Sequence, residues 1–445
     1  MIRAFGALAL LGVFTLLPEG RSTAPNAAAL DVRTLLAAGR GAPPILCALA
    51  GRALGGYGWG FRGDAPATPA GSVLPAAETD FSRLPAADVE LALDGLGTPD
   101  PCVRELSARL LGRQRGEVVA APLVTRLGAA DAALRTAAAF TLGLVQPASA
   151  VDPLVRTLRD PVAEARANAA WALGRIRDGR SLSPVAALVR DGQPLVREAA
   201  VVAVGRFEST STVGLLVGVL RQDEAASVRR VAAWALGQIG SRDATDALAD
   251  ALARDADAEV REMAAWAIGE RDARGAVPAL LAALRADRDE DVRETAAWAL
   301  GNSRDASAVP ALGNAAGGDR SERVRGTASW ALGQLGQHTA PAGLLHAVRD
   351  ESDDVRLKAA WSLGQIGDDA ARPALRDALG RETDARVRRA VVRALMKSGE
   401  RSEQALSELL ASRDPQVRVA AVRGLVGNNA FDPWPWPWPR PRPFP

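Results

Sequence analysis

One short motif recurs down most of the chain at an almost constant interval. Its clearest copy, Ala-Ala-Trp-Ala-Leu-Gly-Gln-Ile-Gly, occupies residues 232–240, and successive copies are 30 to 32 residues apart. Aligned on the Trp position, the copies fall at Arg109, Phe140, Trp171, Val202, Trp234, Trp266, Trp298, Trp330, Trp361, Arg393 and Arg423. A steady period of this length is typical of one supersecondary unit stacked many times, so the sequence predicts a solenoid rather than a single globular core.

The composition agrees with closely packed thin helices. Hydrophobic residues make up 48% of the 445 residues but aromatic residues only 4%, and the apolar content is mainly Ala, Leu and Val. The formal net charge is +2, with 54 basic and 52 acidic residues. This balance provides no strong positive field and disfavours nucleic acid as a partner.

Each unit is expected to hold two helices. In residues 241–271, apolar spacing predicts a first helix over about 244–254, and acidic residues then mark the start of a second helix near Glu259. The second helix is expected to end at Gly269, because glycine commonly terminates helices. Neither helix can bury its apolar stripe alone, so stacking of the units has to supply the core.

The repeat consensus resembles a known family. Asp-Val-Arg followed by Ala-Ala-x-Ala-Leu-Gly-x-Ile-Gly, as in residues 353–367, is similar to the HEAT-like repeats named after phycobilisome bilin lyases. The resemblance covers residues 85–428. It implies an all-α, right-handed α-solenoid of about 11 two-helix repeats, plus a divergent N-terminal cap repeat. It leaves the function open, since the family includes lyases, hydroxylases and scaffolds.

The recurring Trp occupies a distinct helical angle. Trp234 falls about 100° beyond the predicted buried stripe of its helix, which predicts an indole on the shoulder or open face. The resemblance implies that second helices line a concave surface, so the indoles would form a row inside a groove. Packing of each indole on the neighbouring repeat, with its N–H bonded to a glutamine, is the alternative.

A polar residue follows most of these aromatic positions by one helical turn. Trp followed by an amide resembles the arrays with which armadillo-repeat transport receptors hold extended peptides, although only Trp298 with Asn302 matches that pattern literally. On this basis we expect a groove for a protein or extended peptide. Its candidate residues are Phe140, Trp171, Arg175, Trp234, Gln238, Trp266, Glu270, Trp298, Asn302, Trp330, Gln334, Trp361 and Gln365.

An arginine also recurs in every unit, in the Val-Arg dipeptide or its equivalent. The set is Arg104, Arg135, Arg166, Arg197, Arg229, Arg261, Arg293, Arg325, Arg356, Arg388 and Arg418. An anion-binding stripe is one interpretation. The resemblance instead implies structural Arg–Asp pairs between neighbouring repeats, and nearby acidic residues such as Asp160, Asp191, Asp289 and Asp350 favour that interpretation.

The N-terminal region predicts export. In residues 1–24, Arg3 precedes an uncharged apolar run and small residues follow, as in a secretory signal peptide whose cleavage site is uncertain. With this signal, the mature protein is expected to be periplasmic or secreted. A buried N-terminal helix is the alternative interpretation of residues 1–24. The rest of the region, residues 25–84, is rich in Ala, Gly and Pro and contains a degenerate cap repeat over residues 29–56.

The two cysteines, Cys47 and Cys102, leave two alternatives open. In an oxidising compartment they form one disulfide; otherwise they are two separate buried thiols. Two cysteines and two histidines are too few and too scattered for a usual zinc site, so no metal or other cofactor is expected.

Residues 429–445 form a separate tail, in which Pro alternates with Trp434, Trp436, Trp438, Arg440 and Arg442. Such alternation excludes helix and predicts an extended conformation. The tail resembles Trp-, Pro- and Arg-rich membrane-active peptides, which implies contact with a membrane surface. Docking in an aromatic groove of its own chain or a neighbour's and a low-complexity end without function are the alternatives.

The sequence lacks the motifs of an enzyme. No His-Glu-x-x-His, Gly-x-Ser-x-Gly or phosphate loop occurs, and the His-Glu pairs of the iron hydroxylases in the family are missing, since Thr339 follows His338 and Ala347 follows His346. We therefore expect a non-enzymatic binding scaffold. An envelope assembly or surface protein that acts through its tail is the alternative, and a bilin lyase-like accessory role is a weaker one.

Overall fold

The computed structural model describes residues 31–45, 47, 50, 81–114, 116–270, 273–401 and 403–426. These residues form helices joined by short turns, with no strand among them, which confirms the predicted all-α class. The predicted signal peptide and the tail lie outside the described residues, and the predicted cap repeat is described only in part.

Eleven helix pairs follow one another along the described chain, in agreement with the predicted number of units. The first helices of the pairs are α3 (Ala86–Gly95), α5 (Gly116–Arg126), α7 (Val151–Thr157), α9 (Leu182–Ala187), α11 (Val213–Gln222), α13 (Arg242–Arg254), α15 (Val277–Ala286), α17 (Val309–Gly318), α19 (Ala342–Ala347), α21 (Arg372–Arg381) and α23 (Glu403–Leu410). The second helices are α4 (Pro101–Gly112), α6 (Ala132–Val145), α8 (Ala163–Ile176), α10 (Pro194–Arg206), α12 (Ala226–Ile239), α14 (Ala258–Glu270), α16 (Glu290–Asn302), α18 (Glu322–Gln334), α20 (Asp353–Ile366), α22 (Ala385–Lys397) and α24 (Pro415–Val426).

The chain divides into two compact units, residues 1–115 and 116–445. The division falls inside the region 85–428 that the periodicity predicts as one array. In the first unit, α1 (Val32–Gly39) packs against α3 and α4.

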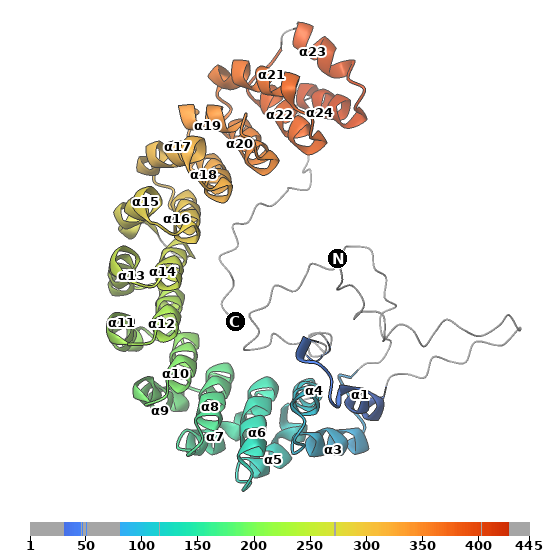
Figure 1. The fold of residues 1–445 in the computed structure, drawn as a ribbon, viewed down its shortest axis with the longest axis vertical. Helices are drawn as coiled ribbons and strands as arrows, with labels where there is room; N and C mark the ends of the chain where they lie inside the picture. Colours follow the sequence, from blue (N-terminus) through green and yellow to red (C-terminus); the bar gives the residue numbers. More distant parts are fainter. Residues whose placement is uncertain are drawn as a thin grey trace, which may run out of the picture. The chain divides into compact units, whose positions relative to one another are not determined.

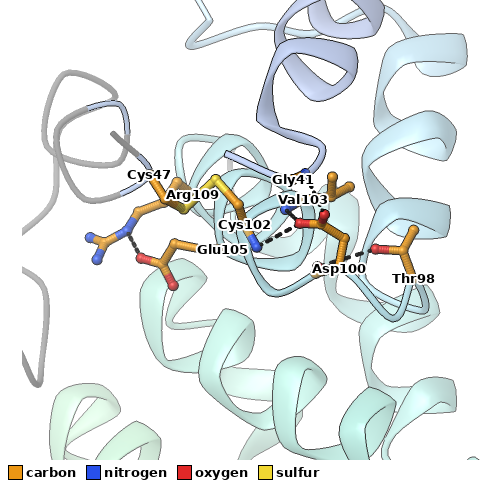
Figure 2. The surroundings of a disulfide bond; sticks show 8 residues. All are labelled: Gly41, Cys47, Thr98, Asp100, Cys102, Val103, Glu105 and Arg109. Atoms are coloured by element: carbon orange, nitrogen blue, oxygen red, sulfur yellow. Dashed lines mark hydrogen bonds and ion pairs between the residues drawn. A yellow bond between two sulfur atoms is a disulfide. The ribbon is translucent and has the colours of Figure 1, made fainter. Parts of the chain in front are cut away.

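A disulfide and a hydrogen bond join the N-terminal part of the first unit to α4. Cys47 and Cys102 are bonded, with their Cα atoms 5.5 Å apart. Beside the disulfide, the Asp100 carboxylate accepts from the backbone N–H of Gly41 at 2.8 Å and from the N–H of Cys102 at 2.9 Å (Figure 2). Of the two alternatives for these cysteines, the structure therefore shows the disulfide.

The second unit is a stack of helix pairs in two layers. Each second helix packs against the second helix before and after it, as α12 does with α10 and α14, and also against the first helix of its own pair. Within this unit the second helices follow the inner side of the curve and the first helices the outer side (Figure 1). We call the layer of second helices from α6 to α24 the inner layer.

Aspartates start many of these helices and left-handed residues end several of them. The Asp289 carboxylate accepts from the backbone N–H groups of Asp291 and Val292 at the start of α16, so it satisfies donors that have no partner within the helix. Gly240 and Gly367, with φ of 67° and 70°, end α12 and α20. Glycine is favoured there because a side chain strains this conformation.

The glycine that follows Leu or Ile in the repeated motif packs closely against the next second helix. Gly269 is the second-last residue of α14, so the helix ends one residue later than expected. A Cβ atom at Gly269 would lie 2.5 Å from Cζ3 of Trp298 and 2.8 Å from Cβ of Ala299 on the next second helix. Gly237 meets Ala267 in the same way, at 2.7 Å from its Cβ. The repeated glycine is therefore needed because neighbouring second helices approach each other closely at this position.

Candidate functional site

Eight of the eleven recurring arginines form a ladder of ion pairs between consecutive repeats, while Arg104, Arg388 and Arg418 donate to backbone carbonyl oxygens. Arg261 shows the geometry: its Nε and one terminal nitrogen donate to the two Asp287 oxygens at 2.8 and 2.9 Å. Its other terminal nitrogen donates to the carbonyl oxygen of Asp255 at 3.0 Å. The same pairing joins Arg135–Asp160, Arg166–Asp191, Arg197–Asp223, Arg229–Asp255, Arg293–Asp319, Arg325–Asp350 and Arg356–Glu382.

Each of these carboxylates also organises the turn that carries it. Asp287, for example, accepts from the backbone N–H of Asp289 at 3.0 Å. Burial alone would raise the pKa of Asp287, but its hydrogen bonds with Arg261 and Asp289 bring that pKa below the usual value. The Asp160 and Asp191 carboxyls likewise have lowered pKa values, chiefly because of Arg135 and Arg166. These arginines are committed to holding repeats together, which confirms the structural interpretation of the ladder.

The indoles of the inner layer are more buried than the helical angle predicts. Trp298 is 2% exposed, Trp171 4% and Trp330 7%, while Trp234, Trp266 and Trp361 are half-buried. Ring atoms pack on the glycine of the preceding second helix, as Trp298 does on Gly269 and Trp361 on Gly333.

The expectation of a row of open indoles is therefore wrong for Trp171, Trp298 and Trp330. A single apolar stripe describes a helix that packs on one side only. A second helix inside a stack has neighbours on both flanks and its own first helix behind it, so its buried arc is wider and includes the Trp position. The indoles mainly fill space between repeats, the alternative that the sequence left open.

The polar residues one turn after the Trp positions remain accessible. Glu270, Asn302, Gln334 and Gln365 are exposed, and Arg175 and Gln238 are half-buried. They occupy the same register position on α8 and on the five consecutive inner-layer helices α12, α14, α16, α18 and α20. We call Arg175, Gln238, Glu270, Asn302, Gln334 and Gln365 the polar row.

The hydrogen bonding of the indole N–H to the polar-row side chain differs between repeats. With the Gln365 amide oriented so that its oxygen faces the indole, it accepts from Nε1 of Trp361 at 2.9 Å. The Nε1 atoms of Trp298 and Trp171 are buried without a partner. Asn302 is one methylene shorter than glutamine, and Arg175 offers no acceptor. Arg175 lies over the Trp171 ring at 5.2 Å, and Phe140 stacks on that ring at 5.1 Å between centroids.

A charged cluster on α16, α18 and α20 was not anticipated from the sequence. Glu294 is only 8% exposed; it pairs with Arg323 and accepts from the Thr327 hydroxyl at 3.1 Å. Burial raises the pKa of Glu294, although Arg323 and Thr327 act in the opposite direction. Nearby, Lys358 pairs with Asp354 at 2.6 Å.

Two signals in the sequence could have revealed this cluster. Lys358 is one of two lysines in the chain, the other being Lys397. Gly326 is the other signal, because its missing side chain leaves room for Lys358, whose Nζ would lie 3.3 Å from a Cβ atom there. Departures from the repeat consensus thus mark this part of the inner layer.

The described residues contain neither a metal-binding cluster nor a helix that could span a membrane. No group of three or more His, Cys, Asp and Glu side chains in these residues is arranged to hold a metal ion. None of the helices in the described part of the chain is long and apolar enough to cross a bilayer. Trp434, Trp436, Trp438, Arg440 and Arg442 lie outside the described residues.

Comparison with known proteins defines the class of repeat. The family model for HEAT repeats matches residues 120–204, 184–269, 277–360 and 341–426. The chain therefore belongs to the HEAT-repeat family. A search of curated proteins finds no significant match.

Several solved structures resemble the chain. Yeast importin-beta (Kap95p) is 16% identical with a TM-score of 0.51, and the match covers 76% of this chain and 57% of the importin. The Escherichia coli protein YibA is 21% identical with a TM-score of 0.44, covering 57% of this chain and 93% of YibA. Human deoxyhypusine hydroxylase is 26% identical with a TM-score of 0.27, covering 56% of this chain and 96% of that enzyme. The importin supports the solenoid fold.

Proposed function

We propose that the protein is a non-enzymatic scaffold that binds an extended protein segment along the inner layer. The observation that carries this proposal is the polar row, in which side chains from the five consecutive repeats ending in α12 to α20 are accessible in one register. Adjacent helices are spaced by about 10 Å, which corresponds to roughly three residues of an extended chain. The row can thus offer a hydrogen-bonding group to about every third residue of the segment.

The indoles support this row rather than form it. Buried rings such as Trp298 fix the spacing between second helices, because they pack on the glycine of the helix before. Half-buried Trp234, Trp266 and Trp361 flank polar-row residues and add apolar surface beside them. A stiff row loses little entropy on binding, which favours affinity for an extended segment.

Proteins of this class provide further support. A solved structure shows Kap95 in a complex with Nup1. The matched structure is 14% identical to this chain, with a TM-score of 0.52. That likeness concerns the fold, and protein binding by this chain is our proposal. The finer resemblance to the phycobilisome-lyase type, with its bilin-handling role, remains a prediction.

Selection from a random display library of 12-residue peptides tests the proposal. Peptides enriched on the full chain should bind a Glu270→Ala, Asn302→Ala, Gln334→Ala variant at least about tenfold more weakly, because three side chain–backbone hydrogen bonds are lost. The matched control changes exposed residues on the first helices of the same repeats: Asp246→Ala, Arg285→Ala and Asn314→Ala. No enrichment, or equal loss in both variants, contradicts the proposal.

We also propose that the protein is exported through residues 1–24. The Cys47–Cys102 disulfide supports this, because disulfides persist mainly in oxidising compartments. A fusion of residues 1–84 to a reporter enzyme that is active only outside the cytoplasm should be active, and the fusion lacking residues 1–24 inactive. Equal activity of the two fusions would rule the signal out.

A further inference from the structure

The row of aromatic residues in the inner layer has one interruption. At the register position of the indoles, α10 carries Val202, which is fully buried. A Cβ atom at Gly174 on the preceding helix would meet Ala203 backbone and Cβ atoms, with no ring atom among its nearest neighbours. The neighbouring glycines do meet rings: Gly143 meets Trp171, and Gly205 meets Trp234 at 3.0 Å.

Two arginines, Arg177 and Arg206, lie at this interruption. Arg175 and Arg206 occupy the same register position on adjacent helices α8 and α10, which pack together. Arg177 follows α8 directly, in a left-handed conformation with φ of 59°. Its guanidinium group lies 3.5 Å from the Glu208 carboxylate, and both side chains are about half exposed.

Arg206 differs from the ladder arginines in having no anionic partner. It makes no hydrogen bond or ion pair with any described residue, and its Nε atom is buried and unpartnered. Burial lowers the pKa of Arg206, and the charge of Arg177 lowers it further. The pKa of Arg261 is raised by Asp287 instead. A half-buried guanidinium stays charged and carries an uncompensated desolvation cost, which an anion would offset.

A second unsatisfied donor lies in the preceding repeat, on α8. Nε1 of Trp171 is buried without a partner, and Trp171 itself is 4% exposed. Arg175 lies over the same ring. Unsatisfied donors thus lie on both α8 and α10, and Glu208 is the only described carboxylate in contact with Arg177.

We propose that Arg206 and Arg177 bind a carboxylate of the protein segment held along the inner layer. Guanidinium groups suit this ligand because their N–H donors match the two oxygens of a carboxylate. The site deepens the proposed function and rests on it, since it fixes where an acidic side chain of the segment lies. The segment would place this acidic residue against α8 and α10.

Calorimetric titration of the full chain with a capped hexaglutamate peptide tests the site, with inorganic phosphate as a second probe. Hexaglutamate should bind, and Arg206→Gln should weaken binding roughly tenfold to a hundredfold, because a charge-assisted hydrogen bond is lost. Arg285→Gln, an exposed arginine on α15, is the matched control and should leave binding unchanged. Phosphate binding that depends on Arg206, without hexaglutamate binding, would keep the oxyanion site but overturn its assignment to a carboxylate.

Stability separates a binding role of Arg206 from a structural one. Without ligand, Arg206→Gln should leave the melting temperature unchanged or raise it, since the variant removes a desolvated charge that has no partner. Hexaglutamate binding equal in Arg206→Gln and wild type, or no binding of either probe, overturns the site. If display-selected peptides depend on Glu270, Asn302 and Gln334 but not on Arg206, the anion site fails while the scaffold function stands.

Discussion

Small residues decide how closely the repeats pack. Gly237 and Ala267 face each other on α12 and α14, and an added methyl group would lie 2.7 Å from the Ala267 Cβ atom. Such a contact is too short for two carbon atoms. The Ala-Leu-Gly part of the motif is therefore a packing requirement between neighbours, which explains why it recurs with the period of the stack.

Replacing Gly237 by alanine should destabilise the second unit by about 1–3 kcal/mol, because overpacking outweighs the better helix propensity of alanine. Gly218 on α11 is the matched control, since a Cβ atom there has nothing within 4 Å. Gly218→Ala should be neutral or stabilise by up to about 1 kcal/mol. Chemical denaturation measures both, and equal effects of the two substitutions would contradict the close approach.

At the scale of the helix, the sequence predicts what depends on local pattern and the period. Apolar spacing and capping aspartates predict the helix pairs and their approximate bounds, and the family resemblance implies the Arg–Asp junctions. The bounds of α13 and α14 differ from the expected 244–254 and 259–269 by at most two residues. Burial of Trp298 did not follow, because it depends on a flanking helix whose contacting residue, Gly269, belongs to the preceding repeat. The Glu294 cluster was missed for the same reason: Glu294, Arg323 and Lys358 come from three repeats.

The junction carboxylates should make the solenoid sensitive to acid. The pKa of Asp287 is lowered in the folded protein, from a usual value of 3.8, so its contribution is fully present above about pH 3.8 and is lost as the pH falls through the folded pKa. Asp287→Asn should destabilise the protein by about 1–3 kcal/mol at pH 7, because Arg261 loses its charged partner. The variant should also lose less stability than wild type between pH 5 and 2, a range of about three units around the carboxyl pKa.

Denaturation midpoints across this pH range measure the effect. Asp246→Asn, an exposed carboxyl on α13, is the control and should follow the wild type. Parallel pH curves for wild type and Asp287→Asn would show that the junction pair does not contribute in this way.

The disulfide should stabilise the first unit alone. Cys47 and Cys102 close a loop with a sequence separation of 55, so replacing both with serine should cost about 2–4 kcal/mol in that unit through greater freedom of the unfolded chain. Hydrogen exchange followed by mass spectrometry can resolve the two units. We expect faster exchange in α1, α3 and α4 and unchanged exchange in α12–α20; faster exchange throughout would contradict a local effect.

At the scale of the whole molecule, stacking separates two tasks. In the second unit, the repeated side chains serve mainly to hold the repeats together, through the Arg–Asp ladder and the buried indoles. Each helix pair is stabilised mainly by contacts with its neighbours. The polar row and the positions around Glu294 and Arg206 depart from the consensus or remain accessible. These residues can differ between repeats, so the charge and hydrogen-bonding groups of the inner layer change from one repeat to the next.

Site-specific photo-cross-linking tests the central claim most directly. A benzophenone amino acid replaces Asn302 on the inner layer or Arg285 on a first helix, both exposed, and each full-length protein is irradiated with a display-selected peptide. We predict a covalent adduct from position 302, competed by unlabelled peptide, and none from position 285. Adducts from position 285, or from neither position despite measurable binding, would contradict binding along the inner layer.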